Sequence, residues 1–136
     1  MIIILKNREK NQILFWYVGT RLAKGTYDVV ILSPRFETVE FKLKSEDINR
    51  VLKEVQKFDR IGQIRASNGK EEIVLLIGLG MDNFPAVVIY QKQLVAHIGE
   101  VEYEHDGIVF RSKSLGTLRF RYCDYNYRGW VAEGGE

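Results

Sequence analysis

The fold is decided by residues 37–58, which read ETVEFKLKSEDINRVLKEVQKF. The first part, from Val39 to Lys44, alternates apolar and charged side chains, as in a strand with one buried and one solvated face. The second part carries its apolar residues at helical spacing, with charged residues on the remaining surface. The stretch therefore predicts a strand that leads directly into one amphipathic helix over residues 45–58.

The ends of this helix also carry recognisable signals. Ser45 is predicted to be the N-cap, because its hydroxyl can accept a bond from a first-turn N–H group. Glu46 and Asp47 place negative charge beside those same groups. Gly62 is predicted to end the helix.

Three strands are predicted before residue 37. Residues 2–5 and 13–18 are continuous apolar runs, which predict strands covered on both faces by a helix, a second sheet or a partner chain. Residues 26–33 form a third strand, which ends at Pro34. One helix can hide only part of so much apolar surface, and we therefore expect a homodimer.

The second half of the chain is predicted to be strand throughout. Asn68-Gly69 marks a turn, and apolar runs follow at 73–79, 86–90 and 94–98. The predicted order is four strands, the helix and five to seven further strands. The fold class is α+β, with mainly antiparallel strands in a curved sheet or a two-sheet sandwich and the helix packed on the sheet.

Length and composition bound the organisation of the chain. Its 136 residues predict a single globular domain over 1–136, with a frayed C-terminal tail at about 131–136. With 46% hydrophobic and 12% aromatic residues the chain can bury a core, which excludes a disordered protein. The formal net charge of +2 is too small to indicate a partner.

Further features indicate a soluble, cytoplasmic protein. The only cysteine, Cys123, cannot form an intrachain disulfide and fits a reducing compartment. No apolar run approaches the roughly 18 residues of a membrane span. The apolar start is followed at once by Lys6 and Arg8, whereas a signal peptide carries its charge first.

Residues 100–122 predict two hairpins with a defined register. A type I′ turn at Asp106-Gly107 places Glu102 opposite Arg111 and Glu100 opposite Lys113. A three-residue loop at Ser114-Leu115-Gly116, with positive φ at Gly116, then places Arg111 opposite Arg119. No acid is evident for Arg119 or Arg121, and like charges in opposed positions are unfavourable.

These arginines predict a function. Five cations and three aromatic side chains fall close together and supply the phosphate contacts and stacking platforms that single-stranded DNA or RNA requires. The predicted nucleic-acid-binding residues are Arg111, Lys113, Arg119, Arg121, Tyr125, Tyr127, Arg128 and Trp130. In the alternative reading the aromatic residues cover the open end of the core, and the arginines are solvated or paired with Glu133 and other acids.

Other function classes stay open. Glu100, Glu102, Glu104 and Asp106 are candidates for a divalent cation in a metal-dependent nuclease, or form a ladder neutralised by Arg111 and Lys113. A structural or interaction domain that self-associates through its apolar strands is a further alternative. His97, His105 and Cys123 show no spacing typical of nucleophilic catalysis. We therefore expect a non-catalytic protein without cofactor or metal.

The order of the first five elements, with VEFKLK running into Ser45-Glu-Asp-Ile, resembles the unit of single-strand-binding proteins of the positive cofactor 4, PUR and Whirly families. The resemblance covers residues 2–58 and consists of element order. It implies a similar sheet-and-helix unit and carries over no binding residue.

Overall fold

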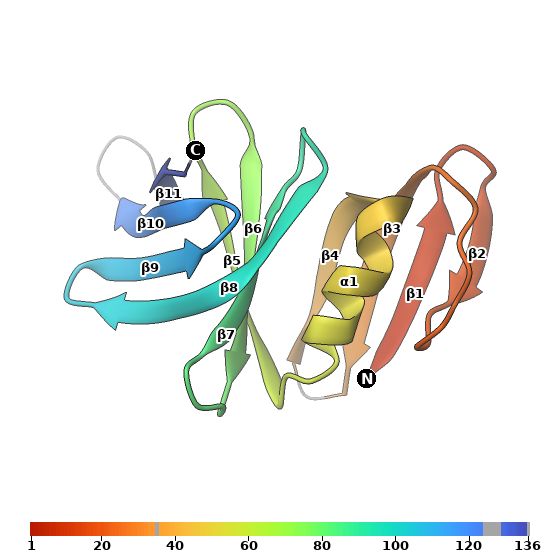
Figure 1. Ribbon diagram of the computed structural model, residues 1–136, viewed down its shortest axis with the longest axis horizontal. Helices are drawn as coiled ribbons and strands as arrows, with labels where there is room; N and C mark the ends of the chain where they lie inside the picture. Colours follow the sequence, from red (N-terminus) through yellow and green to blue (C-terminus); the bar gives the residue numbers. More distant parts are fainter. Residues whose placement is uncertain (35, 124–128, 136) are drawn as a thin grey trace.

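A computed structural model describes residues 1–34, 36–123 and 129–135, and its strands form a four-stranded sheet and a closed barrel (Figure 1). The four-stranded sheet, here called the N-terminal sheet, is antiparallel and has the order β2-β1-β3-β4. Its strands are β1 (Ile2–Asn7), β2 (Gln12–Phe15), β3 (Thr26–Ser33) and β4 (Phe36–Lys44). The helix α1 (Ser45–Val55) follows β4 directly. The predicted strand–helix junction is confirmed.

The barrel follows the helix and closes in the order β10-β11-β5-β6-β7-β8-β9. Its strands are β5 (Arg60–Ser67), β6 (Glu72–Leu79), β7 (Pro85–Tyr90), β8 (Val95–Glu104), β9 (Gly107–Ser112), β10 (Gly116–Cys123) and β11 (Gly129–Gly134). Neighbouring strands are antiparallel except β11 and β5, which pair in parallel and close the barrel. The predicted α+β class, mainly antiparallel, is confirmed, with a barrel beside an open sheet.

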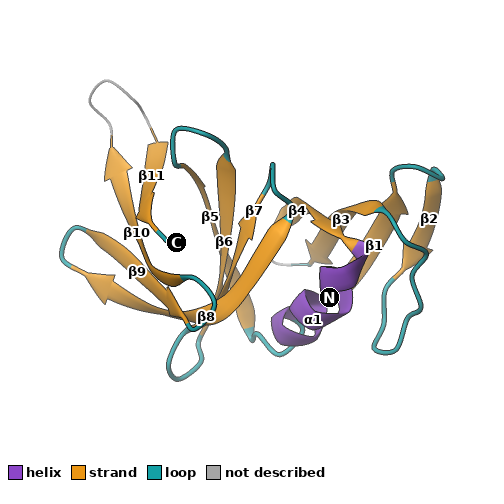
Figure 2. Cartoon of the chain, turned by 45° about the horizontal axis from the view of Figure 1, so that its top comes forward, coloured by secondary structure: helices purple, strands orange, loops and turns teal. Residues whose placement is uncertain are grey.

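The buried apolar residues form two clusters. One fills the barrel, with Phe110 and Phe120 among its largest fully buried side chains. The other lies between α1, the inner face of the N-terminal sheet and the outer side of β6 and β7. Figure 2 shows α1 beside the sheet and near β8, in the angle between the two β parts. Strands β6 and β7 are therefore buried on both faces, as their continuous apolar runs predict.

The predicted start of the helix at residue 45 is confirmed, but its predicted N-cap and its predicted end are wrong. Lys44 is the N-cap and its side chain makes no capping bond, while Ser45 is already helical. The Ser45 hydroxyl bonds to the Glu46 carboxylate instead, at 2.7 Å. The helix ends at Val55 because the chain must turn there to bury Phe58 and enter β5. Gly62 lies within β5.

Several strand predictions also need correction. Residues 13–18 are not a strand covered on both faces: β2 ends at Phe15 and forms an edge of the sheet. Strand β1 buries one face only. The predicted strand 94–98 is the beginning of the longer β8. Residues 131–134 of the predicted frayed tail belong to β11, which pairs with both β10 and β5.

Within the described ranges of the chain, no helix combines the length and apolar character that crossing a membrane requires.

Candidate functional site

In both hairpins of the predicted nucleic-acid site, the observed strand register differs from the predicted register by two residues. Glu100 lies opposite Arg111, and the turn is formed by His105-Asp106. In the next hairpin Arg119 lies opposite Val109 and Arg111 opposite Thr117. The predicted opposition of Arg111 and Arg119 is therefore wrong. A shift by two keeps each side chain on its own face, so the alternating pattern fits both registers equally well.

Each arginine of these strands has a carboxylate partner. Arg111 is paired with Glu102 across β8 and β9. An Arg119 Nη1 atom lies 2.8 Å from Glu104 Oε1. Arg121 Nη2 lies 2.8 Å from Glu133 Oε1 of β11. The prediction that no acid lies near Arg119 and Arg121 is thus wrong, and the alternative reading, in which these arginines pair with Glu133 and other acids, agrees with the structure.

Among the described residues, the charges on this outer face of the barrel balance. Its cations are Arg111, Lys113, Arg119 and Arg121, and its carboxylates are Glu100, Glu102, Glu104 and Glu133. The side chains of Glu102 and Arg119 flank Val109 in register, and Val109 is only 1% exposed. The aliphatic parts of these charged side chains therefore cover Val109. A polyanion would have to displace carboxylates to reach Arg111, Arg119 or Arg121.

The aromatic half of the predicted site is only partly described. Tyr125, Tyr127 and Arg128 lie outside the described residues. Trp130 is half-buried on β11, and its ring meets the edge of Tyr122 at a centroid distance of 5.7 Å. Tyr122 lies near the end of β10 and is 58% exposed.

The acidic ladder is largely engaged in these ion pairs. Glu102 and Glu104 each hold an arginine, while Asp106 lies in the exposed turn after β8. Among the residues that the structure describes, no three His, Cys, Asp or Glu side chains converge as metal ligands would. The geometry thus agrees with a neutralised cross-strand ladder.

The histidines and the cysteine do not come together as a reactive pair. His97 Nδ1 lies 2.8 Å from Ser114 Oγ, and the imidazole packs edge-on against Tyr90. Burial, aided by Arg50, lowers the pKa of His97 and favours a neutral ring whose Nδ1 can accept a hydrogen bond from the Ser114 hydroxyl. His105 is exposed in a turn, and Cys123 is half-buried at the end of β10. The serine contact spans 17 residues of sequence and has no local signal.

The N-terminal sheet has an uncovered side, here called the open face, which points away from α1. Strand alternation and register assign to it Ile2, Ile4, Lys6, Ile13, Phe15, Asp28, Val30, Leu32, Thr38, Glu40 and Lys42. Ile4 lies directly between Phe15 and Val30 on the neighbouring strands. Ile13 and Phe15 are 68% and 66% exposed. The open face therefore presents a contiguous apolar patch to solvent, of the kind that marks interaction sites.

A cleft of about 770 Å³ runs along this face to the barrel. The sheet contributes apolar side chains such as Ile4 and Ile13. The barrel contributes Gln63 and Arg65 from β5, Glu72 from β6 and Gln91 from the turn after β7. Three cations (Lys6, Lys42 and Arg65) and three carboxylates (Asp28, Glu40 and Glu72) line it. The positive and negative side chains of the cleft are equal in number, so the cleft favours neither an anionic nor a cationic ligand. It also has apolar side chains in its lining.

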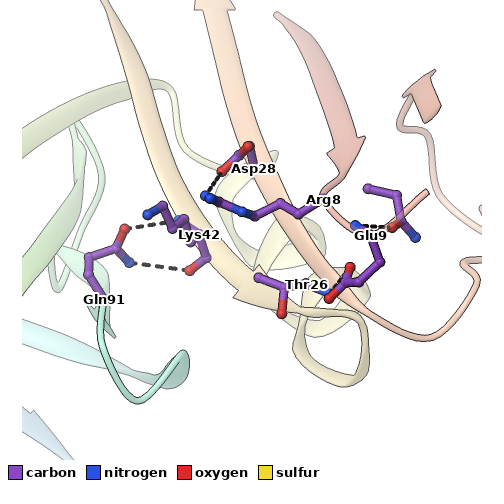
Figure 3. Close-up of polar contacts among 7 residues, drawn as sticks. Arg8, Glu9, Thr26, Asp28, Lys42 and Gln91 are labelled. Atoms are coloured by element: carbon purple, nitrogen blue, oxygen red, sulfur yellow. Dashed lines mark hydrogen bonds and ion pairs between the residues drawn. The ribbon is translucent and has the colours of Figure 1, made fainter. Parts of the chain in front are cut away.

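The two edges of the N-terminal sheet differ sharply. At the β4 edge, the Gln91 amide accepts a bond from Lys42 N at 2.9 Å and donates to Lys42 O at 3.2 Å, as Figure 3 shows. Arg65 donates to the neighbouring Glu40 carbonyl. Side chains of the barrel thereby cap the backbone groups that would otherwise pair with another strand.

The β2 edge has no comparable cap among the described residues. Trp16 N donates to Ile3 O, so in this antiparallel pair Leu14 also bonds toward β1. The backbone N–H and C=O groups of Ile13 and Phe15 consequently point outward. No described group bonds to them.

The segment after β2 leaves this edge open because it packs toward the helix. Trp16 Nε1 donates to Asn49 Oδ1 at 2.8 Å, and Asn49 Nδ2 donates to Thr20 O at 3.2 Å. The apolar runs of residues 2–5 and 13–18 are the sequence signals for this surface, and both predict strands covered on two faces instead.

Comparison with protein-family models, with curated proteins and with solved structures finds no match for this chain.

Proposed function

We propose that this protein is a protein-binding domain, and that the open face and the β2 edge together receive an extended segment of polypeptide. One observation carries the proposal: an exposed apolar patch adjoins an uncapped strand edge, in a sheet whose other edge is capped by Gln91 and Arg65. An added strand would supply backbone partners for Ile13 and Phe15 and place alternate side chains over the apolar patch.

The chemistry of the cleft favours a polypeptide over other ligands. A polypeptide strand offers backbone hydrogen bonds, apolar side chains and charges of both signs, and the cleft has the counterpart of each. A nucleic acid requires a net positive surface to release counterions, and the charges here are equal in number.

Single-stranded nucleic acid binding is the alternative function. Its support is that Arg119 and Arg121 are exposed on β10, and that the same strand carries the exposed ring of Tyr122 near its end. Surface ion pairs contribute only about 0–1 kcal/mol, so a phosphate group could compete for these arginines.

The test is selection of binding peptides from a displayed random library. The Ile13→Lys/Phe15→Lys variant changes only exposed positions, and Tyr103→Lys/Tyr122→Lys is the matched control on the barrel. Peptides with alternating apolar residues should bind wild type and control alike. They should bind the β2 variant at least tenfold more weakly, since one buried large apolar side chain contributes about 1.5–3 kcal/mol.

Equal binding by the β2 variant would refute this surface. Fluorescence anisotropy of labelled single-stranded DNA and RNA at two salt concentrations tests the alternative. Micromolar, salt-sensitive binding that Arg119→Ala/Arg121→Ala abolishes would establish the nucleic-acid function in place of peptide binding.

A further inference from the structure

The exposed edge of the N-terminal sheet has a sequence suited to pairing with itself. Strand β2 reads Gln-Ile-Leu-Phe and carries no charge, whereas natural edge strands are usually guarded by a charge, a proline or a bulge. Two copies of this strand can approach without bringing like charges together. The absence of such guards is informative because the same sheet guards β4 with two barrel side chains.

The outward backbone groups define one two-fold register. Ile13 and Phe15 are the residues of β2 whose N–H and C=O groups point outward. An antiparallel neighbour that places Phe15 opposite Ile13, and Ile13 opposite Phe15, satisfies both residues on both chains. Leu14 then lies on the two-fold axis.

We propose that the strand received at this edge is β2 of a second copy of this chain. Pairing in this register joins the two N-terminal sheets into one continuous eight-stranded sheet, and each Phe15 ring lies beside Ile13 of the other copy on the open face. This inference rests on the proposed function and names its partner.

The charges beside the strand are compatible with this pairing. Because the paired strand spans only Gln12–Phe15 and Lys10 lies in the turn before it, the two Lys10 residues lie beyond the two Gln12 residues. In this register the two Gln12 residues are four strand positions apart, or about 13 Å at about 3.3 Å per residue. That separation exceeds the Debye length of about 8 Å at physiological ionic strength.

The size of the contact sets the expected strength. Strand β2 has four residues, and Tyr17 and Val18, which are also exposed, extend the apolar surface beyond its end. Such a contact belongs with small interfaces, below about 1,200 Å² in total, which are typically weak. The dimer is therefore to be sought by sedimentation velocity between about 1 μM and about 1 mM protein.

Cysteine pairing tests the register. In a Cys123→Ser background, Ile13→Cys and Phe15→Cys chains are mixed and oxidised, with an affinity tag on one of them. Position 13 faces position 15 of the other copy at about 5.5 Å between Cα atoms, within the range of a disulfide. Position 13 of one copy and position 13 of the other are diagonal neighbours at about 7–8 Å, beyond that range. The mixture should therefore give the mixed disulfide, and each variant alone should give little dimer.

A second experiment tests the hydrogen bond that the Ile13 N–H donates to the other copy. Ile13→Pro removes the outward N–H without breaking a bond to β1, and Ile13→Val keeps it as the matched control. Proline should raise the dimer dissociation constant at least tenfold, because two equivalent hydrogen bonds are lost across the two-fold axis. Circular dichroism checks that both variants fold.

Each outcome decides the proposal. The mixed disulfide with a tenfold weaker proline variant supports it. If the protein stays monomeric to about 1 mM but selects peptides at β2, the proposal that a second copy is the partner is wrong and the protein-binding function is retained. A monomer that selects no peptide at β2 overturns both.

Discussion

Leu76 is the residue whose truncation tests how the barrel and the N-terminal sheet depend on one another. It lies on β6 and points out of the barrel into the cluster that α1 and the sheet share. Leu75, the next residue, points into the barrel. Both side chains are fully buried, so Leu76→Ala and Leu75→Ala remove the same atoms from the two sides of one strand.

The cost follows from burial. Truncating a fully buried leucine to alanine destabilises a protein by about 2–5 kcal/mol, the sum of lost transfer energy and a residual cavity. With a urea m-value of about 2 kcal/mol/M, a loss of about 3 kcal/mol lowers the unfolding midpoint by about 1.5 M. Both variants should show a decrease of this order.

The two tryptophans report on the two parts separately. Trp16 is buried in the shared cluster, and Trp130 packs against the interior cluster of the barrel. Urea titrations followed by fluorescence, in Trp130→Phe and Trp16→Phe backgrounds, therefore follow each part alone. Because Leu76 joins the parts, each truncation should shift both transitions together.

Separate transitions would refute this reasoning. If Leu75→Ala lowered the midpoint seen by Trp130 and left that seen by Trp16 unchanged, the shared cluster would not couple the parts. The assignment of Leu76 to a core that unites them would then be wrong.

Two further predictions concern charged groups. Burial and Arg50 lower the pKa of His97 below its ordinary 6.5, so the folded protein binds fewer protons than the unfolded chain and loses stability as the pH falls below about 6.5. The urea midpoint should fall further between about pH 7.5 and pH 5 in wild type than in His97→Gln, and equal decreases would contradict the assignment. A double-mutant cycle on Glu104 and Arg119 should give an attraction of about 0.2–1 kcal/mol that weakens at high salt. Repulsion between Arg119 and Arg111 without that attraction would show that the structural register is wrong.

Much of the fold was predictable from local pattern. The alternation from Val39 to Lys44 and the helical stripe after Ser45 are properties of consecutive residues, and both elements form as expected. The continuous runs of β6 and β7 likewise predicted strands buried on both faces. Such signals are reliable because the period of apolar residues reflects which sides of one element meet the core.

The candidate site was less predictable. The run of residues 13–18 looks as apolar as β6, yet Ile13 and Phe15 are mostly exposed. Whether an apolar strand is covered depends on which distant segments reach it, and the segment after β2 packs on α1 instead. The Gln91 cap at β4 also joins residues that are 49 positions apart.

By itself the sequence determined the types of element, the helix and the face to which each strand residue points, because these follow from the geometry of neighbouring residues. Only the tertiary structure decided strand register, barrel closure by β11 beside β5, and the partners of Arg119 and Arg121. The physical reason is the two-residue period of a strand: a shift by two preserves every face while changing every cross-strand neighbour. The packing of Phe110 and Phe120 in the barrel accompanies one of these registers, and the ion pairs follow from it.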